Sequence, residues 1–152
     1  MIDELLDSAR LLAGEPNQTS ACLRRAVSTA YYAVFHALAE LASESLLPGV
    51  ARASDAYVRV YRALEHRRLK NAFMQAPLKD DNRFRAIGNA VVQLQVERAR
   101  ADYLPCDPSL FSLNVVTDLL VQAQGVIVDL RGLGRDERRT LAVCLLFRDR
   151  RD

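Results

Sequence analysis

The chain has 152 residues, half of them hydrophobic, and a formal net charge of only +2 at neutral pH. This length predicts one domain with a single core, and a net charge so close to zero argues against nucleic-acid binding driven by overall charge alone. Three widely spaced cysteines, Cys22, Cys106 and Cys144, argue against a disulfide framework or a zinc site. We therefore expect a cytoplasmic protein without a metal or other cofactor.

The N-terminal segment is acidic and amphipathic, unlike a signal peptide. No apolar run approaches the ~20 residues that a membrane-spanning helix needs, so no membrane span is expected. The longest apolar run near the C-terminus, residues 141–147, lies between arginine-rich flanks. We interpret it as the buried face of a last helix, with docking on a membrane surface as the alternative.

Apolar residues recur at helical spacing along almost the whole chain. They predict helices over the ranges 2–13, 20–46, 54–76, 82–102, 109–130 and 136–148, and the second part of the range 54–76 is either the same helix or a kinked continuation of it. Polar N-caps are expected at Thr19 or Ser20, at Ser54, at a carboxylate of the segment 77–81, and at Asp107 ahead of Pro108. The fold class is therefore all-α: an up-and-down bundle of four or five helices with an extra short C-terminal helix. We assign residues 1–132 to the bundle and 133–152 to a C-terminal extension packed on the same domain.

The predicted helix over 20–46 carries three different faces at about 100° per residue. One is an apolar stripe of Leu23, Val27, Ala30, Val34, Leu38 and Leu41. Beside it runs a strip of small residues, Cys22, Ala26, Ala33 and Ala37. A polar edge lies roughly opposite and consists of Arg25, Thr29, Tyr32 and His36. A helix covered over most of its circumference, with one polar edge left, is typical of the centre of a bundle.

Arg98 continues the apolar line of its predicted helix and precedes Asp102 by one turn. An arginine on a buried line needs a partner or a cleft. Two interpretations follow: a structural pair with Asp102 that fixes the end of the helix, or a contact to a phosphate in a dimer groove. We also expect Arg24 to pair with the Asp102 carboxylate.

A basic edge is predicted on the helix over 54–76, where Arg59, Arg62, His66 and Lys70 share one side. Three interpretations of this edge are open: a solvated face, a nucleic-acid contact patch, or a site in which Arg59 and His66 form a catalytic pair. His36 is either a hydrogen-bonded structural residue or a group that faces a ligand. The neighbouring aromatic residues, Tyr31, Tyr32 and Phe35, favour a core or dimer interface over a platform for stacking bases.

Two motifs resemble those of the HEPN domains, which are helical modules named for nucleotide binding in higher eukaryotes and prokaryotes. The segment from Arg24 to His36 is similar to their R-x-A-x-x-x-A-Y-Y-A-x-F-H pattern, and residues 97–105, ERARADYLP, are similar to an R-x-x-ADY-x-P helix ending. The resemblance implies a four- or five-helix bundle that forms a homodimer. It also implies metal-independent endoribonuclease activity, often as a bacterial toxin paired with a nucleotidyltransferase-like antitoxin.

In that family the activity rests on an arginine followed, after four to six residues, by a histidine. The histidine is the general acid/base and the arginine binds the developing phosphorane charge. Here no histidine follows Arg98 or Arg100 at that spacing, and none lies beyond His66. We therefore predict a non-catalytic module that binds a protein partner, a nucleotide or RNA. Its candidate ligand-binding residues are Arg25, Tyr32, His36, Arg62, Lys70, Arg98 and Asp102. The alternative is a ribonuclease with a rearranged site built from Arg59, Arg62 and His66, or from Arg98 and Tyr103.

Overall fold

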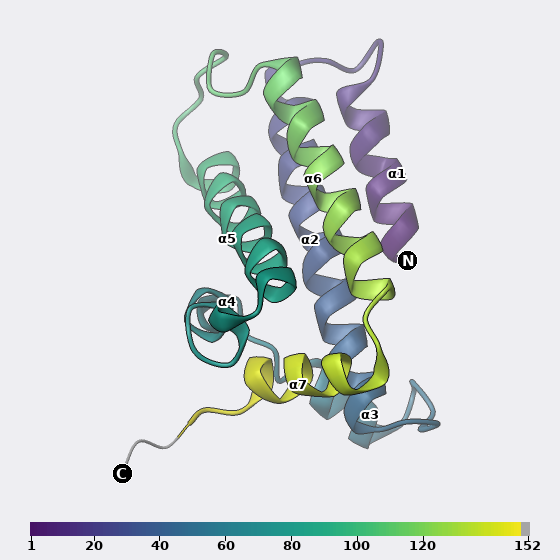
Figure 1. Ribbon diagram of the computed structural model, residues 1–152. Helices are drawn as coiled ribbons and strands as arrows, with labels where there is room; N and C mark the ends of the chain where they lie inside the picture. Colours follow the sequence, from purple (N-terminus) through teal and green to yellow (C-terminus); the bar gives the residue numbers. More distant parts are fainter. Residues whose placement is uncertain (150–152) are drawn as a thin grey trace. The chain divides into compact units, whose positions relative to one another are not determined.

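The computed structural model describes residues 1–149, and every regular element in this range is helical, which confirms the all-α fold class. Figure 1 shows the elements in chain order. They are α1 (Ile2–Ala13), α2 (Ser20–Leu46), α3 (Asp55–Tyr61), α4 (His66–Phe73), the 3-10 turn η1 (Leu78–Asp80), α5 (Asn82–Tyr103), α6 (Leu113–Arg131) and α7 (Arg135–Leu146). The last three residues of the predicted C-terminal extension lie outside the described range.

Contacts divide the chain into two compact units, each built from segments that are distant in sequence. The first unit, Met1–His36 with Ala90–Val128, holds α1, the first part of α2, the second part of α5 and most of α6; these segments lie side by side as a helical bundle (Figure 1). The second unit, Ala37–Asn89 with the chain from Asp129 onward, holds the short helices, and in it α4 packs against α7. The proposed division at residue 132 stays a prediction.

Side-chain caps fix three of the predicted helix starts. Thr19 Oγ1 accepts a hydrogen bond from the backbone N–H of Cys22 at 3.2 Å, and Ser54 Oγ accepts one from Tyr57 at 3.3 Å. The carboxylate that starts α5 belongs to Asp81, whose Oδ1 accepts from two backbone N–H groups, at 2.8 and 3.1 Å. Each cap satisfies donors that the first turn of a helix leaves without partners.

The segment 54–76, predicted as one helix or as a helix with a kinked continuation, is not continuous: the structure divides it into α3 and α4. The backbone of Glu65 is extended (φ −115°, ψ 132°), so helical hydrogen bonding stops after Tyr61 and starts again at His66. Leu64 lies in this break and is only 5% exposed. Burial of its side chain offsets the hydrogen bonds that a continuous helix would have gained.

The predicted start of the helix over 109–130 is also wrong. Asp107 does not cap it: its Oδ1 accepts from both the backbone N–H and the hydroxyl of Ser109, at 2.9 and 2.7 Å, and so closes a local turn. The helix begins later, at Leu113, and its cap is Ser112, whose Oγ accepts from the backbone of Val115 at 3.2 Å. Asp and Ser both form such turns, which compete with helix initiation.

Helix α2 is buried as its sequence predicts. The apolar stripe and the alanines of the small strip are all at most 8% exposed, and Cys22 is half-buried. Along the polar edge, Arg25 is exposed, whereas Thr29, Tyr32 and His36 are half-buried. The edge is therefore partly covered, and its polar groups meet other residues of the protein.

Helix α6 is the one described helix that is long and apolar enough to cross a membrane, with a mean hydropathy of 1.3 over its most apolar window. About two fifths of that window, 39%, is buried, and core helices of soluble proteins have the same composition. The expected absence of a membrane span stays a prediction. In α7 the apolar run does form a buried face, Leu141, Ala142, Leu145 and Leu146, but Phe147 follows the helix and is 60% exposed.

Candidate functional site

Arg98 lies near the end of α5, on the same face as the buried residues Val91 and Leu94, and only 14% of its side chain is exposed. Its Nε is 3.2 Å from Asp102 Oδ2, an ion pair whose angle does not meet hydrogen-bond geometry. Its Nη2 donates a hydrogen bond to the hydroxyl oxygen of Tyr32 on α2 at 2.9 Å. Arg98 therefore forms the predicted pair with Asp102 and also joins α5 to α2.

Three tyrosine rings surround the Arg98 guanidinium. Its Cζ lies 5.4 Å from the ring centroid of Tyr31, 5.3 Å from that of Tyr32 and 5.9 Å from that of Tyr103. These distances permit cation–π attraction, which is stronger where water is excluded. Tyr31 is fully buried, whereas Tyr103 is 75% exposed and borders the site on its solvent side.

The protonation states of this cluster follow from burial and charge. Burial by itself lowers the pKa of Arg98, but the hydrogen bond and charge of Tyr32, together with Asp102 and Tyr31, raise it above its ordinary value. Burial raises the pKa of Tyr31 well above its usual range, and the Arg98 charge only partly opposes this. The cluster thus holds Arg98 as a cation beside the protonated Tyr31 phenol.

Arg24, the first residue of the HEPN-like motif, binds the end of α5. Its Nε donates to the carbonyl oxygen of Ala101 at 2.7 Å, its Nη1 donates to that of Pro105 at 3.1 Å, and its Nη2 donates to that of Leu104. The predicted pair with the Asp102 carboxylate is therefore wrong. The reason is that a helix end exposes carbonyl oxygens without helical partners, and a guanidinium fork reaches several of them at once.

His36 lies one turn beyond Tyr32 on the polar edge of α2. Burial lowers its pKa, and its ring meets the Phe35 ring edge-on at a centroid distance of 6.1 Å. Arg25, on the same predicted edge, is exposed to solvent. Of the predicted ligand-binding residues, the first unit thus brings Tyr32, Arg98 and Asp102 into one cluster.

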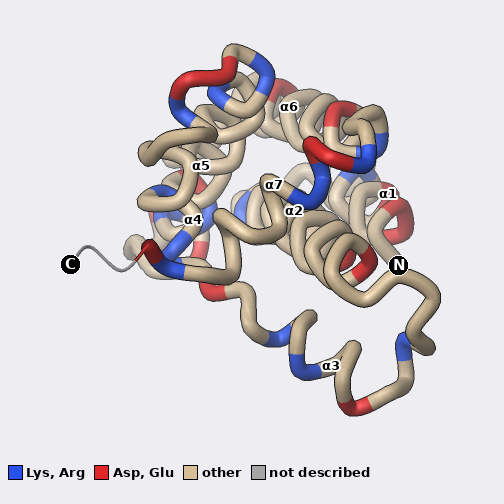
Figure 2. The backbone as a smooth tube through the Cα atoms, turned by 60° about the horizontal axis from the view of Figure 1, so that its bottom comes forward, with Lys and Arg blue, Asp and Glu red and all other residues tan. Residues whose placement is uncertain are grey.

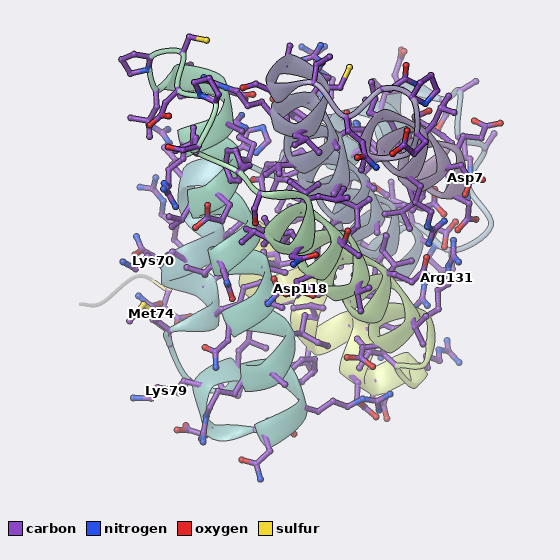
Figure 3. The ribbon with its side chains drawn as sticks, turned by 90° about the horizontal axis from the view of Figure 1, so that it is seen from above. Asp7, Lys70, Met74, Lys79, Asp118 and Arg131 are labelled. Carbon is purple, nitrogen blue, oxygen red and sulfur yellow. The ribbon has the colours of Figure 1, made fainter. Side chains whose placement is uncertain are left out.

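The basic edge predicted for Arg59, Arg62, His66 and Lys70 does not exist as one helix face. Arg59 belongs to α3 and Arg62 ends it, whereas His66 and Lys70 belong to α4. The break between these helices removes the helical spacing on which an Arg59–His66 pair depended. Lys70 is exposed and points outward, as do Met74 and Lys79 (Figure 3).

The sequence reasoning missed a groove between α4 and α7. Two adjoining cavities of about 450 and 410 Å³ lie there and share the lining residues Ala72, Gln75, Cys144, Phe147 and Asp149. The first is also lined by the arginines Arg67, Arg68 and Arg148. Figure 2 marks basic positions on α4 and on the segment after α7. In the sequence, only the adjacent arginines 67 and 68 indicate a basic site here, because Arg148 lies far from them along the chain.

In the described part of the chain, no group of three or more histidine, cysteine or acidic side chains is placed to hold a metal ion. Comparisons of the chain with models of protein families, with curated proteins and with solved structures find no match. The HEPN resemblance accordingly rests on the two sequence motifs. Within the first unit, Tyr32 of one motif contacts Arg98 of the other, and Arg24 donates to the backbone of Ala101.

Proposed function

We propose that this chain is a HEPN-like module that binds RNA or a nucleotide without cleaving it. The supporting observation is the environment of Arg98, which with Arg100 is one of the two arginines from which the family's arginine–histidine spacing is counted. Its guanidinium is engaged by Asp102 and Tyr32 and is mostly buried, so it is held for a structural purpose. At the positions where the family has a histidine, this chain has Tyr103, Leu104 and Pro105.

The chemistry of RNA cleavage supports this choice. Attack by a 2′-hydroxyl needs a group that exchanges a proton near neutral pH, which a histidine does well. Tyrosine has an ordinary pKa of about 10 and arginine one above about 12, so neither meets this need. The Arg98 cluster can therefore stabilise charge but is poorly equipped to move protons.

The alternative is a metal-independent endoribonuclease, such as the toxin of a toxin–antitoxin pair. The observation in its favour is that the exposed Tyr103 ring lies 5.9 Å from the Arg98 guanidinium carbon. In this alternative Tyr103 transfers the proton while Arg98 stabilises the phosphorane. His66, on α4, is the other residue that it offers for proton transfer.

One experiment separates the two functions. A fluorescently labelled structured RNA is incubated with the protein in EDTA, and both anisotropy and cleavage are followed. We expect binding without cleavage. Cleavage that is lost in Tyr103→Phe, His66→Ala or Arg98→Lys would establish the enzyme and overturn the proposal. Tyr103→Phe is the sharpest of these variants, because an exposed residue can be changed without unfolding the chain.

The proposal includes a homodimer in the cytoplasm and, as a further partner, a nucleotidyltransferase-like protein. Both partners are what the HEPN resemblance implies. If the protein binds no RNA or nucleotide but forms a stable complex with such a partner, the module is a protein-interaction domain and the proposed ligand is wrong.

A further inference from the structure

The larger of the two cavities in the α4–α7 groove is bordered by more positive than negative side chains. Arg68 joins the two helices that line the groove, because Arg68 Nη1 donates to the carbonyl oxygen of Leu146 at the end of α7, at 2.7 Å. Arg67 pairs with Glu65 at 2.8 Å, yet its side chain is 79% exposed. Arg148 is also exposed and lines the same cavity. Three guanidinium groups thus border a hollow of about 450 Å³.

The carboxylates nearby do not balance these three cations. The hydrogen bond from Arg67 lowers the pKa of Glu65, and the charges of Arg67, Arg68 and Arg148 add to the effect, so all three arginines act on one carboxylate. Among the described residues, Asp149 is the one acidic residue in the lining of the 450 Å³ cavity. Three positive charges therefore face two negative ones, and an incoming anion would meet a net attraction.

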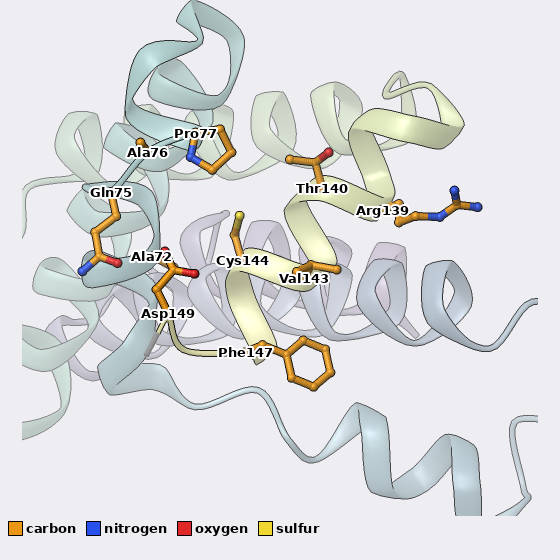
Figure 4. A pocket seen from close by; sticks show the side chains of 10 residues that line it. All are labelled: Ala72, Gln75, Ala76, Pro77, Arg139, Thr140, Val143, Cys144, Phe147 and Asp149. Atoms are coloured by element: carbon orange, nitrogen blue, oxygen red, sulfur yellow. The ribbon is translucent and has the colours of Figure 1, made fainter. Parts of the chain in front are cut away.

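The remaining lining suits a particular kind of anion. Asn71 and Gln75 bring amide N–H donors beside the arginines, a set that matches the several oxygens of a phosphate better than a single carboxylate. The lining of the adjoining cavity includes the apolar side chains of Ala72, Ala76, Pro77 and Val143, beside the polar side chains of Arg139 and Thr140. Figure 4 shows Ala72 of α4, with Ala76 and Pro77 of the segment after it, across this cavity from α7, and the Cys144 sulfur directed into it.

Phe147 lines both cavities and is 60% exposed, so a flat aromatic group can rest against its ring. Burial raises the pKa of Cys144 and the nearby Asp149 charge raises it further, which keeps the thiol protonated and favours a binding role over a reactive one. Cavities of 410 and 450 Å³ lie in the size range of small-ligand sites.

We infer that the α4–α7 groove binds a nucleoside monophosphate, either free or as the terminal nucleotide of an RNA strand. Arg67, Arg68 and Arg148 surround the phosphate, and the base lies against Phe147. This inference rests on the proposed function, because it names the ligand group and the place where the module holds it. It requires no contribution from the Arg98 cluster.

Calorimetry with adenosine 5′-monophosphate, adenosine and inorganic phosphate tests the free ligand. A short oligoribonucleotide with a 3′-terminal dye, with and without a 5′-phosphate, tests the strand by anisotropy. Because hydrogen bonds to charged groups are strong, we expect the monophosphate to bind at least about tenfold more tightly than adenosine. Equal binding of the two, or no nucleotide binding at all, would overturn the inference.

Paired variants locate the site. Arg67→Gln with Arg148→Gln should weaken binding at least about tenfold, whereas Lys79→Gln with Arg135→Gln removes the same charge from two exposed positions that line neither cavity and should change it less than about twofold. Arg59→Gln with Arg62→Gln tests the basic positions of α3 separately. Arg68 is left intact because it ties α4 to α7. Phe147→Ala should also weaken binding, and its matched control is Met74→Ala, another exposed apolar residue next to α4. Thermal melts confirm that each variant is folded.

The outcomes separate this inference from the proposed function. If the groove variants bind like the wild type while structured RNA still binds, the groove is wrong and the RNA-binding module stands. If the Arg59/Arg62 variant is the one that loses binding, the ligand lies at the α3 region and the groove is again wrong. If neither nucleotide nor RNA binds the wild-type protein, the proposed function fails as well.

Discussion

The Tyr32 hydroxyl oxygen on α2 accepts a hydrogen bond from Arg98 Nη2 on α5, with a donor–acceptor distance of 2.9 Å. Together with the Arg98–Asp102 ion pair, this contact compensates for the loss of water around the Arg98 guanidinium, since the side chain is only 14% exposed. A buried charge that loses one of its partners is costly, because the desolvation penalty remains. The Tyr32 hydroxyl should therefore contribute measurably to stability.

Tyr32→Phe removes this hydroxyl and keeps the ring. We expect the free energy of unfolding to fall by about 1–3 kcal/mol, the usual range for a hydrogen bond to a charged group. Urea unfolding followed by circular dichroism measures it. Tyr103→Phe is the control, since Tyr103 also lies beside Arg98 but is 75% exposed, and it should change stability by less than about 0.5 kcal/mol. Equal effects of the two variants would contradict the role assigned to Tyr32.

Arg24→Lys should weaken the end of α5. A lysine ammonium cannot reproduce a fork that donates to the carbonyl oxygens of Ala101, Leu104 and Pro105. We expect a loss of about 1–2 kcal/mol in unfolding free energy and faster amide hydrogen exchange in the last turn of α5. Arg25→Lys changes the exposed neighbour and should leave both unchanged. If the two lysine variants behaved alike, the carbonyl contacts would not be stabilising.

The lowered pKa of His36 predicts how stability depends on pH. Burial disfavours the charged imidazole in the folded state, so the unfolded chain, with a pKa near 6.5, binds the proton first as pH falls. The neutral His36 ring makes its full contribution to the free energy of unfolding above the unfolded-state pKa. This contribution is lost as pH falls from about 6.5 toward the folded-state pKa. His36→Gln should therefore flatten the loss of stability measured by urea unfolding between about pH 8 and about pH 5. An unchanged slope would exclude His36 as its source.

Local patterns predicted most of the fold because local physics determines most of it. The apolar stripe from Leu23 to Leu41 and the caps at Thr19 and Ser54 depend on residues within a few positions of each other. The position of the break between α3 and α4 was not predicted, because packing beyond the local segment determines where the helix stops. Burial of Leu64 and the extended backbone of Glu65 end α3, although the sequence there still has helical spacing.

The candidate site shows the same limit. Sequence spacing predicted the Arg98–Asp102 pair, because the two residues are one turn apart on one helix. It also placed Tyr32 on a polar edge, but the contact of Tyr32 with Arg98 depends on how α2 and α5 pack. The α4–α7 groove needs Arg68 and the end of α7 to meet, and no local pattern carries that information.

A homodimer is the expected solution state. Light scattering coupled to gel filtration should give a mass of about twice the 17.0 kDa of one chain at micromolar concentration. A mass of a single chain would contradict the assembly that the HEPN resemblance implies, while leaving the α4–α7 groove untouched, since one chain supplies all of its lining.

Alanine substitutions at Gly88 and Gly125 should change the free energy of unfolding in opposite directions. In α5, a Cβ built on Gly88 would lie 2.8 Å from the Cβ, Cγ and Cδ1 atoms of Phe73, whose side chain is 5% exposed. Gly88→Ala therefore forces the α4 side chain to move in a packed region, at a cost of about 1–3 kcal/mol. In α6, a Cβ on Gly125 meets no described atom within 4 Å.

Gly125→Ala should instead stabilise the protein by about 0.5–1 kcal/mol, because alanine loses less backbone entropy than glycine when a helix forms. Gly88→Ala gains the same helix propensity. Its net change in the free energy of unfolding is therefore the cost of the clash with Phe73 minus that gain. Urea unfolding of the two variants should give shifts of opposite sign. Stabilisation by Gly88→Ala would mean that α4 can withdraw from α5 without cost, and the close approach of Phe73 would then have no role in holding the second unit together.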